Sequence, residues 1–266
     1  MTSTEDFAEV NGTRLYYETA GEGEVIVLVH GFSVDTRMWD AQFASLAEHY
    51  RVVRYDMRGF GQSALPDEKA YDPCVDLLAL LDFLNIEKVS LIGLSLGGWV
   101  VLDFAVAYPE RVRALVCADA ALMGFEWKNG RPSTLPVEVA QTRGIEAAKQ
   151  YWMGSALFSA ALRNPRVLRK LDEMVSTYSG WHWTHENPQI MADEPTIYNL
   201  KNISCPTLVL VGEHDTEDFR SIADILAQDI PDSEFFMIEN AGHMSNMENP
   251  QRFNEILVNF LAHRLK

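Results

Sequence analysis

A serine flanked by glycines stands where the chain changes from a predicted strand to a predicted helix. Gly93-Leu94-Ser95-Leu96-Gly97 has the pattern G-x-S-x-G, and it follows the apolar run Val89–Gly93. A sharp turn of this kind presents the serine hydroxyl at the end of the strand, and the N–H groups of the following helix point at the same spot. We therefore predict that Ser95 is a nucleophile. The alternative is a tightly packed turn without chemistry.

A serine hydroxyl is unreactive without a base and a group that orients the base. Two later segments supply them in the order acid and then histidine. Asp215 follows the buried run Thr207–Gly212, and His243 follows the next strand pattern, Glu234–Ile238. We predict that His243 takes the proton of Ser95 and that Asp215 holds the imidazole in the required tautomer.

Other acidic residues compete for the role of Asp215. Glu213 and Asp218 lie close to it in the sequence, and Asp119 follows the strand pattern Ala114–Ala118. Asp119 could reach the same histidine from a neighbouring strand end, so it is the main alternative. We favour Asp215.

A further turn can supply donors for a developing negative charge. His30-Gly31-Phe32 follows the apolar run Val25–Val29, where a backbone N–H can meet that of the residue after the nucleophile. We predict that the N–H groups of Phe32 and Leu96 form an oxyanion hole, and that His30 orders the loop. No metal-ligand spacing links the remaining histidines, so we expect neither a metal nor a cofactor.

The elements that position these residues alternate between short apolar runs and longer helical patterns. Runs without polar alternation are typical of strands covered on both faces, and hence of a parallel sheet between helices. The predicted strands are Arg14–Thr19, Val25–His30, Arg51–Tyr55, Val89–Gly93, Ala114–Ala118, Thr207–Gly212 and Glu234–Ile238. The predicted helices of this part are Cys74–Leu84, Leu96–Tyr108, Phe219–Gln228 and Gln251–Leu265. The pair Asn11-Gly12 predicts a hairpin at the start of the sheet.

One segment interrupts this alternation. Between Leu122 and Pro195 there are helical patterns, Pro136–Met153 and Pro165–Tyr178, and a concentration of tryptophans. We interpret residues 122–195 as a helical cap, and residues 1–121 and 196–266 as the core. The predicted apolar pocket is lined by Trp99, Trp127, Trp152 and Met244.

These blocks together resemble the α/β-hydrolase fold with a cap. The resemblance rests on His30-Gly31-Phe32, the stretch 56–63 (DMRGFGQS), the stretch 93–98 (GLSLGG), the stretch 212–215 (GEHD) and the stretch 241–244 (AGHM). It implies an α/β fold, a mostly parallel eight-stranded sheet with helices on both faces and a helical cap after the sixth strand. In this family the stretch 56–63 is a structural loop, which gives Arg58 and Ser63 no catalytic role.

Within the family, the chain is most similar to bacterial carboxylesterases and 3-oxoadipate enol-lactonases. Ser95 stands where haloalkane dehalogenases and epoxide hydrolases carry an aspartate, and no lysine lies near His243, as hydroxynitrile lyases would usually require. The resemblance implies a serine esterase that forms an acyl-enzyme. The alternatives are an enol-lactonase or carbon–carbon bond hydrolase of aromatic degradation and, more distantly, a slow-turnover ligand receptor. An enol-lactonase must hold a carboxylate, for which the cap offers Arg131, Arg143, Arg163, Arg166 and Arg169.

The charge of the chain bears on its partners. The 266 residues contain 22 Lys and Arg against 38 Asp and Glu, a formal charge of −16, which disfavours nucleic acids and anionic membranes. Residues 122–195 contain eight basic and eight acidic side chains, so the core carries the whole excess. This distribution favours small or medium, largely neutral ester or lactone substrates.

The remaining sequence features concern location and assembly. Three scattered cysteines do not indicate a disulfide framework. The opening residues lack the basic and apolar regions of a signal peptide, and no run of eighteen apolar residues occurs. We expect a cytoplasmic protein, and the sequence leaves a homodimer open.

Overall fold

Two of the apolar runs form strands that are buried along their whole length. Every residue of β5 (Val89–Leu94) and β7 (Thr207–Gly212) is buried, because helices cover both faces of the sheet. The computed structural model describes residues 3–128 and 130–265. The other strands are β1 (Thr4–Val10), β2 (Thr13–Ala20), β3 (Val25–Val29), β4 (Arg51–Tyr55), β6 (Val112–Ala118) and β8 (Ser233–Ile238).

These eight strands form one sheet in the order β1-β2-β4-β3-β5-β6-β7-β8. The strands from β3 to β8 run parallel to one another, whereas β2 pairs antiparallel with both β1 and β4. Asn11 and Gly12 both have positive φ, 45° and 69°, as the predicted hairpin turn requires. The mostly parallel, eight-stranded sheet is therefore confirmed, and each predicted strand lies within two residues of an observed one.

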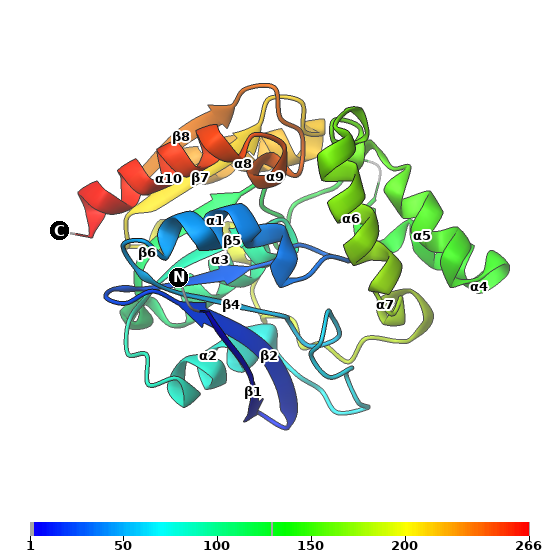
Figure 1. Ribbon diagram of the computed structural model, residues 1–266, viewed down its shortest axis with the longest axis horizontal. Coiled ribbons are helices and arrows are strands. Elements are labelled where there is room, and N and C mark those ends of the chain that lie inside the picture. Colours follow the sequence, from blue (N-terminus) through cyan, green and yellow to red (C-terminus); the bar gives the residue numbers. More distant parts are fainter. Residues whose placement is uncertain (1–2, 129, 266) are drawn as a thin grey trace.

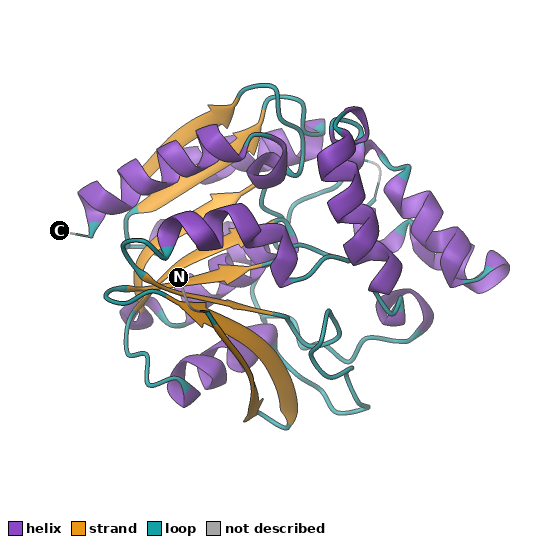
Figure 2. Ribbon diagram, viewed as in Figure 1, coloured by secondary structure: helices purple, strands orange, loops and turns teal. Residues whose placement is uncertain are grey.

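The helices cover the two faces of the sheet and one of its edges (Figures 1 and 2). Helices α1 and α10 pack together on one face, and α2 and α3 pack together on the other, where α8 contacts β7. No helix in residues 3–128 and 130–265 is long and apolar enough to cross a membrane. The core helices are α1 (Asp40–Leu46), α2 (Pro73–Phe83), α3 (Leu96–Ala107), α8 (Glu217–Asp229), α9 (Ser245–Glu248) and α10 (Pro250–Arg264).

The segment between β6 and β7, which we continue to call the cap, is mostly helical. Its helices are α4 (Pro136–Arg143), α5 (Ile145–Met153), α6 (Pro165–Thr177) and α7 (Trp181–Thr184), joined by loops and short 3-10 turns. The predicted helical pattern Pro136–Met153 forms two helices, α4 and α5, rather than one. Gly144 separates α4 from α5 because its φ of 86° cannot continue a right-handed helix.

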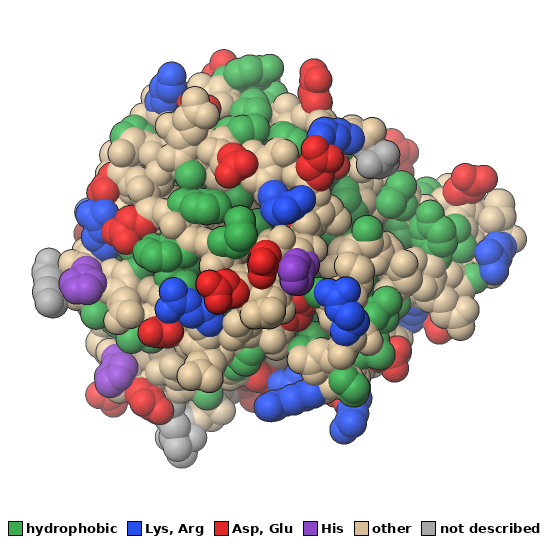
Figure 3. Space-filling model, turned by 90° about the horizontal axis from the view of Figure 1, so that it is seen from above, with side chains coloured by type: hydrophobic (Ala, Val, Ile, Leu, Met, Phe, Trp, Pro, Cys, Tyr) green, Lys and Arg blue, Asp and Glu red, His purple; other side chains and the backbone are tan. Residues whose placement is uncertain are grey.

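The cap stands at the end of the sheet where the parallel strands terminate (Figure 2). The chain segments that follow β5, β7 and β8 all emerge at this edge, so Ser95, Asp215 and His243 are brought there from distant parts of the sequence. On the molecular face seen in Figure 3, acidic and basic side chains are interspersed rather than gathered by sign.

Candidate active site

Ser95 occupies a strained turn between β5 and α3. Its φ of 56° and ψ of −113° lie outside the regions that most side chains adopt, at a cost of about 1–3 kcal/mol. Close packing of glycines makes the turn attainable. A Cβ atom on Gly93 would lie 2.2 Å from the carbonyl oxygen of Gly97, and one on Gly97 would lie 2.1 Å from that of Val29. The G-x-S-x-G spacing is thus required by backbone contacts.

The side chain of Ser95 is available for chemistry. It does not cap α3, although it occupies the N-cap position where serine ordinarily accepts a hydrogen bond from the helix. Instead Ser95 lines a cavity of about 50 Å³ beneath the cap. The predicted pocket residues Trp99, Trp127 and Trp152 line the same cavity. Met244 is not among its lining residues and packs in the hydrophobic core.

His243 and Asp215 form a buried hydrogen-bonded pair. Nδ1 of His243 lies 2.9 Å from Oδ2 of Asp215, and the two side chains are 3% and 0% exposed. With Asp215 ionised, Nδ1 carries the proton and Nε2 is left as the acceptor. The ring of Phe219 packs on the imidazole at 4.1 Å between centroids and also lines the cavity beside Ser95. The histidine therefore lies next to Phe219, which forms part of the wall of the cavity that Ser95 lines.

Two of the three competing acids, Asp119 and Glu213, are held by other partners. Asp119 accepts hydrogen bonds from the Gly212 N–H, at 2.7 Å, and from the hydroxyl of Ser245. Burial, together with the charge of Asp215, raises the pKa of Asp119 well above its ordinary value. Glu213 accepts from the Asn240 N–H at 2.9 Å. Asp119 thus braces the loops around the pair instead of contacting His243.

The loop after β3 passes directly beside Ser95. A Cβ atom on Gly31 would lie 3.6 Å from that of Ser95, and both Phe32 and Leu96 line the small cavity. Neither the Phe32 nor the Leu96 N–H donates a backbone hydrogen bond within the described residues. Two unengaged donors beside a serine can serve as an oxyanion hole if both face the same bound oxygen.

His30 orders this loop. Its Nε2 accepts from the Met57 N–H at 3.0 Å, so Nδ1 is assigned the proton and donates to the Gly31 carbonyl at 2.7 Å. Burial lowers the pKa of His30 to about 4, which keeps the ring neutral at physiological pH.

The cap holds the same loop from the other side. Trp152 of α5 donates from Nε1 to the hydroxyl of Ser33 at 2.6 Å. Phe32 is packed edge-on against Trp152, Tyr178 and His182, with ring centroids 5.7 to 5.8 Å apart. Ser33 and His182 could not be predicted from the sequence, because neither belongs to a motif and only the fold brings them to Phe32.

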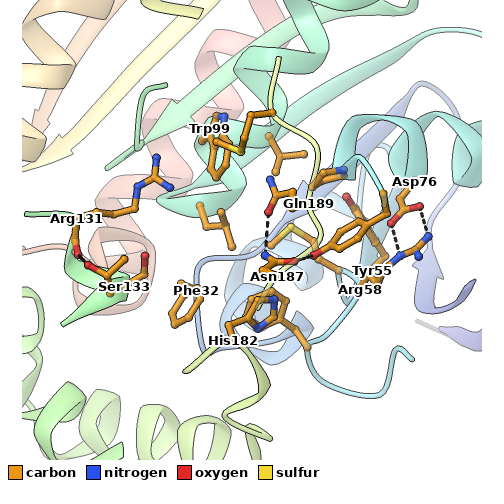
Figure 4. A pocket seen from close by; sticks show the side chains of 18 of the residues that line it. Phe32, Tyr55, Arg58, Asp76, Trp99, Arg131, Ser133, His182, Asn187 and Gln189 are labelled. Carbon is orange, nitrogen blue, oxygen red and sulfur yellow. Dashed lines mark hydrogen bonds and ion pairs between the residues drawn. The ribbon is translucent and has the colours of Figure 1, made fainter. Parts of the chain in front are cut away.

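A larger cavity of about 340 Å³ adjoins the small one (Figure 4). Its wall includes His182 and also Arg58, for which the family resemblance implies no catalytic role. Arg58 is engaged with Asp76 through two hydrogen bonds of 2.9 and 2.7 Å. His182 stacks on Phe60, and burial lowers the pKa of its imidazole to about 4. Most of this wall comes from outside the triad segments, so local motifs could not have identified it.

Comparison with known families decides the assignment of the fold. The profile described as "Alpha/beta hydrolase family" matches residues 26–256. The chain belongs to the alpha/beta hydrolase family. The match spans the small cavity, the buried pair and the cap of this hydrolase.

Individual relatives of this hydrolase are distant in sequence and close in structure. It is 29% identical to 3-oxoadipate enol-lactonase 2 of Acinetobacter baylyi, with 90% of each chain covered. The enol-lactonase from Burkholderia xenovorans LB400 superposes with a TM-score of 0.84 at 28% identity, over 97% of this chain and 100% of that one. A thermophilic esterase from Thermogutta terrifontis, solved with malate bound, has a TM-score of 0.84 at 29% identity, with 98% of each chain covered.

Proposed function

We propose that this hydrolase cleaves carboxylic esters through an acyl-enzyme formed on Ser95. The observation that carries the proposal is the buried Asp215–His243 pair, whose imidazole packs against Phe219 of the cavity that the strained Ser95 also lines. Such an arrangement can activate a hydroxyl that would otherwise be a weak nucleophile.

In the first half of the proposed reaction, the Ser95 hydroxyl attacks the ester carbonyl and passes its proton to Nε2 of His243. Asp215 stabilises the resulting imidazolium through Nδ1. The negative oxygen of the tetrahedral intermediate accepts hydrogen bonds from the Phe32 and Leu96 N–H groups, each worth about 3 kcal/mol in transition-state stabilisation. His243 then protonates the departing alcohol as the carbon–oxygen bond breaks.

In the second half, water replaces the alcohol. His243 removes a proton from water as it attacks the acyl-enzyme, and a second tetrahedral intermediate forms in the same oxyanion hole. Collapse of this intermediate returns the proton to Ser95 and releases the carboxylic acid. Every proton transfer uses His243 Nε2, so the proposal needs no further acid or base.

The test is hydrolysis of 4-nitrophenyl hexanoate by the wild type, by Ser95→Ala and by Ser159→Ala, the last a matched change at an exposed serine of the cap. We expect Ser95→Ala to lose at least about 10³-fold in kcat and Ser159→Ala to retain wild-type activity. A fluorophosphonate should add its mass to the peptide that contains Ser95. Undiminished hydrolysis by Ser95→Ala would refute the proposed mechanism.

Enol-lactone hydrolysis is the second candidate. A lactone is an internal ester and would open by the same steps, and two of the relatives named above are enol-lactonases. A kcat/KM several orders of magnitude higher on an enol-lactone than on acyclic esters would favour this candidate.

A further inference from the structure

The two cavities beneath the cap meet at a single cationic side chain. Some residues line both cavities. A ligand that reacts at Ser95 and is too long for the small cavity must pass these residues to enter the larger one. These shared residues are Phe32, Leu96, Trp99, Arg131 and Ser133. Arg131 is the basic residue among them.

Arg131 differs from the other arginines of the cap in its surroundings. Arg143, Arg163, Arg166 and Arg169 are exposed, whereas Arg131 is partly buried. Its guanidinium lies over the Trp99 ring at 5.1 Å from the centroid (Figure 4), and Asp103 fixes that ring by accepting from its Nε1 at 2.5 Å. The structure thus selects one of the five arginines that the sequence offered.

The positive charge of Arg131 has no protein counter-ion. In residues 3–128 and 130–265, no carboxylate lies within ion-pair distance of its guanidinium. Burial lowers the pKa of Arg131 from its ordinary value, yet the guanidinium stays protonated near neutrality. A cation taken partly out of water without a partner is unfavourable unless a ligand supplies the opposite charge.

The other charges of the larger cavity cancel. Arg58 is neutralised by the bidentate contact with Asp76 at the opposite end of the cavity from Arg131 (Figure 4). His182 is uncharged at neutral pH because it is buried. The combined cavity therefore presents one net positive charge, between the reacting serine and the aromatic walls.

We propose that Arg131 binds a free carboxylate of the substrate, so that this hydrolase acts on esters or lactones that carry one free carboxylate besides the bond that is cleaved. The inference rests on the proposed function and narrows its substrate class. A planar guanidinium matches a carboxylate through two parallel hydrogen bonds, and one cation balances one carboxylate. The larger cavity would hold the carbon chain between the carboxylate and the reacting carbonyl or alcohol.

For binding inside the cavity, the positive charge of Arg131 matters more than the net negative charge of the whole molecule. The excess of −16 belongs to the core, and salt screens exposed charges beyond about 8 Å at physiological ionic strength. Arg131 acts inside a cavity, where contact with a ligand excludes that screening. The expectation of largely neutral substrates therefore gives way to carboxylate-bearing ones.

The test compares two esters that differ at one end. 4-Nitrophenyl hexanoate ends in a methyl group, and 4-nitrophenyl hydrogen adipate carries a carboxylate in its place. In Arg131→Met we expect kcat/KM for the adipate ester to fall about 10- to 100-fold, which is the loss expected when a hydrogen bond between two charged groups is removed. We expect kcat/KM for the hexanoate ester to change by less than about threefold. Longer pairs of the same design locate the chain length at which the effect is largest.

Two controls and one binding measurement complete the experiment. Arg143→Met, at an exposed cap arginine, should alter neither ester, and Arg131→Lys should recover part of the adipate activity. Free adipate should inhibit hexanoate hydrolysis competitively in the wild type and about tenfold more weakly in Arg131→Met. Equal losses on both esters in Arg131→Met, or no loss on either, would overturn the carboxylate site. Failure of the proposed function is a separate result, in which the wild type hydrolyses neither ester faster than Ser95→Ala.

Discussion

Replacement of Asp215 by asparagine tests how the buried pair works. The carboxylate accepts from His243 Nδ1 at 2.9 Å, with both side chains shielded from water, so an amide in its place can turn a donor toward the ring. The imidazole would then hold its proton on Nε2, the atom that has to receive the proton of Ser95. The charge that stabilises the imidazolium is lost at the same time.

Both effects act on the transition state. We expect Asp215→Asn to lower kcat about 10³- to 10⁴-fold, which corresponds to about 4–5.5 kcal/mol. The fold should survive, because asparagine has nearly the same volume and can still accept from the Thr216 N–H, which lies 2.6 Å from Oδ1 of Asp215. Steady-state hydrolysis of 4-nitrophenyl hexanoate and thermal unfolding measure the two quantities on the same preparations.

The matched control is Asp119→Asn, the same chemical change at a second buried carboxyl. Asp119 accepts hydrogen bonds from the Gly212 N–H and the Ser245 hydroxyl and does not contact the histidine. The amide of an asparagine at this position can still accept from the Gly212 N–H and can donate to the Ser245 hydroxyl. We expect kcat to stay within about tenfold of wild type. A loss in Asp119→Asn as large as in Asp215→Asn would refute the assignment of the acid.

Two further predictions concern the contact of Trp152 with Ser33, which joins the cap to the core, and the buried carboxyl of Asp103 on α3. Trp152→Phe keeps an aromatic ring but removes the hydrogen bond to the buried Ser33 hydroxyl. We therefore expect the free energy of unfolding to fall by about 1–3 kcal/mol and kcat to fall with little change in KM. A rise in KM alone would mean that Trp152 only shapes the pocket. Asp103 accepts from Trp99 and from Thr196, and burial raises its pKa from 3.8 to about 6. Because the folded form holds the proton more tightly, Asp103 makes stability decrease as pH rises from about 4 to 6, by up to about 3 kcal/mol. Urea unfolding at pH 4.5 and 7.5 should show this decrease in the wild type and not in Asp103→Asn.

The sheet was predictable because its strands are locally distinctive. Fully buried strands such as β5 and β7 appear in the sequence as unbroken apolar runs, and the Asn11-Gly12 turn has few alternative conformations. The break between α4 and α5 was also encoded locally, in Gly144, but the surrounding helical pattern obscured it. Helix α1 was missed because its seven residues are too few for a clear period.

The site was predictable only in part. Ser95, Asp215 and His243 follow strands, so their meeting at one sheet edge could be inferred from the order of the elements. The choice between Asp215 and Asp119 depended on which carboxylate points at the imidazole, and that orientation depends on the three-dimensional packing of the loops. The selection of Arg131 likewise needed burial and the absence of a nearby acid among the described residues, neither of which has a sequence signature.

The aromatic packing around Phe32 limits which parts of this hydrolase can be exchanged with those of a relative. Phe32, whose N–H we propose as an oxyanion donor, also has its ring embedded among Trp152, Tyr178 and His182 of the cap. In a chimera that receives the cap of a relative, the new cap would not fit the ring of Phe32, and the N–H of Phe32 in the proposed oxyanion hole would be displaced. The loop from His30 to Ser33 would have to be exchanged together with the cap. The cap and that loop form one exchangeable unit, although more than a hundred residues separate Ser33 from Trp152 in the sequence.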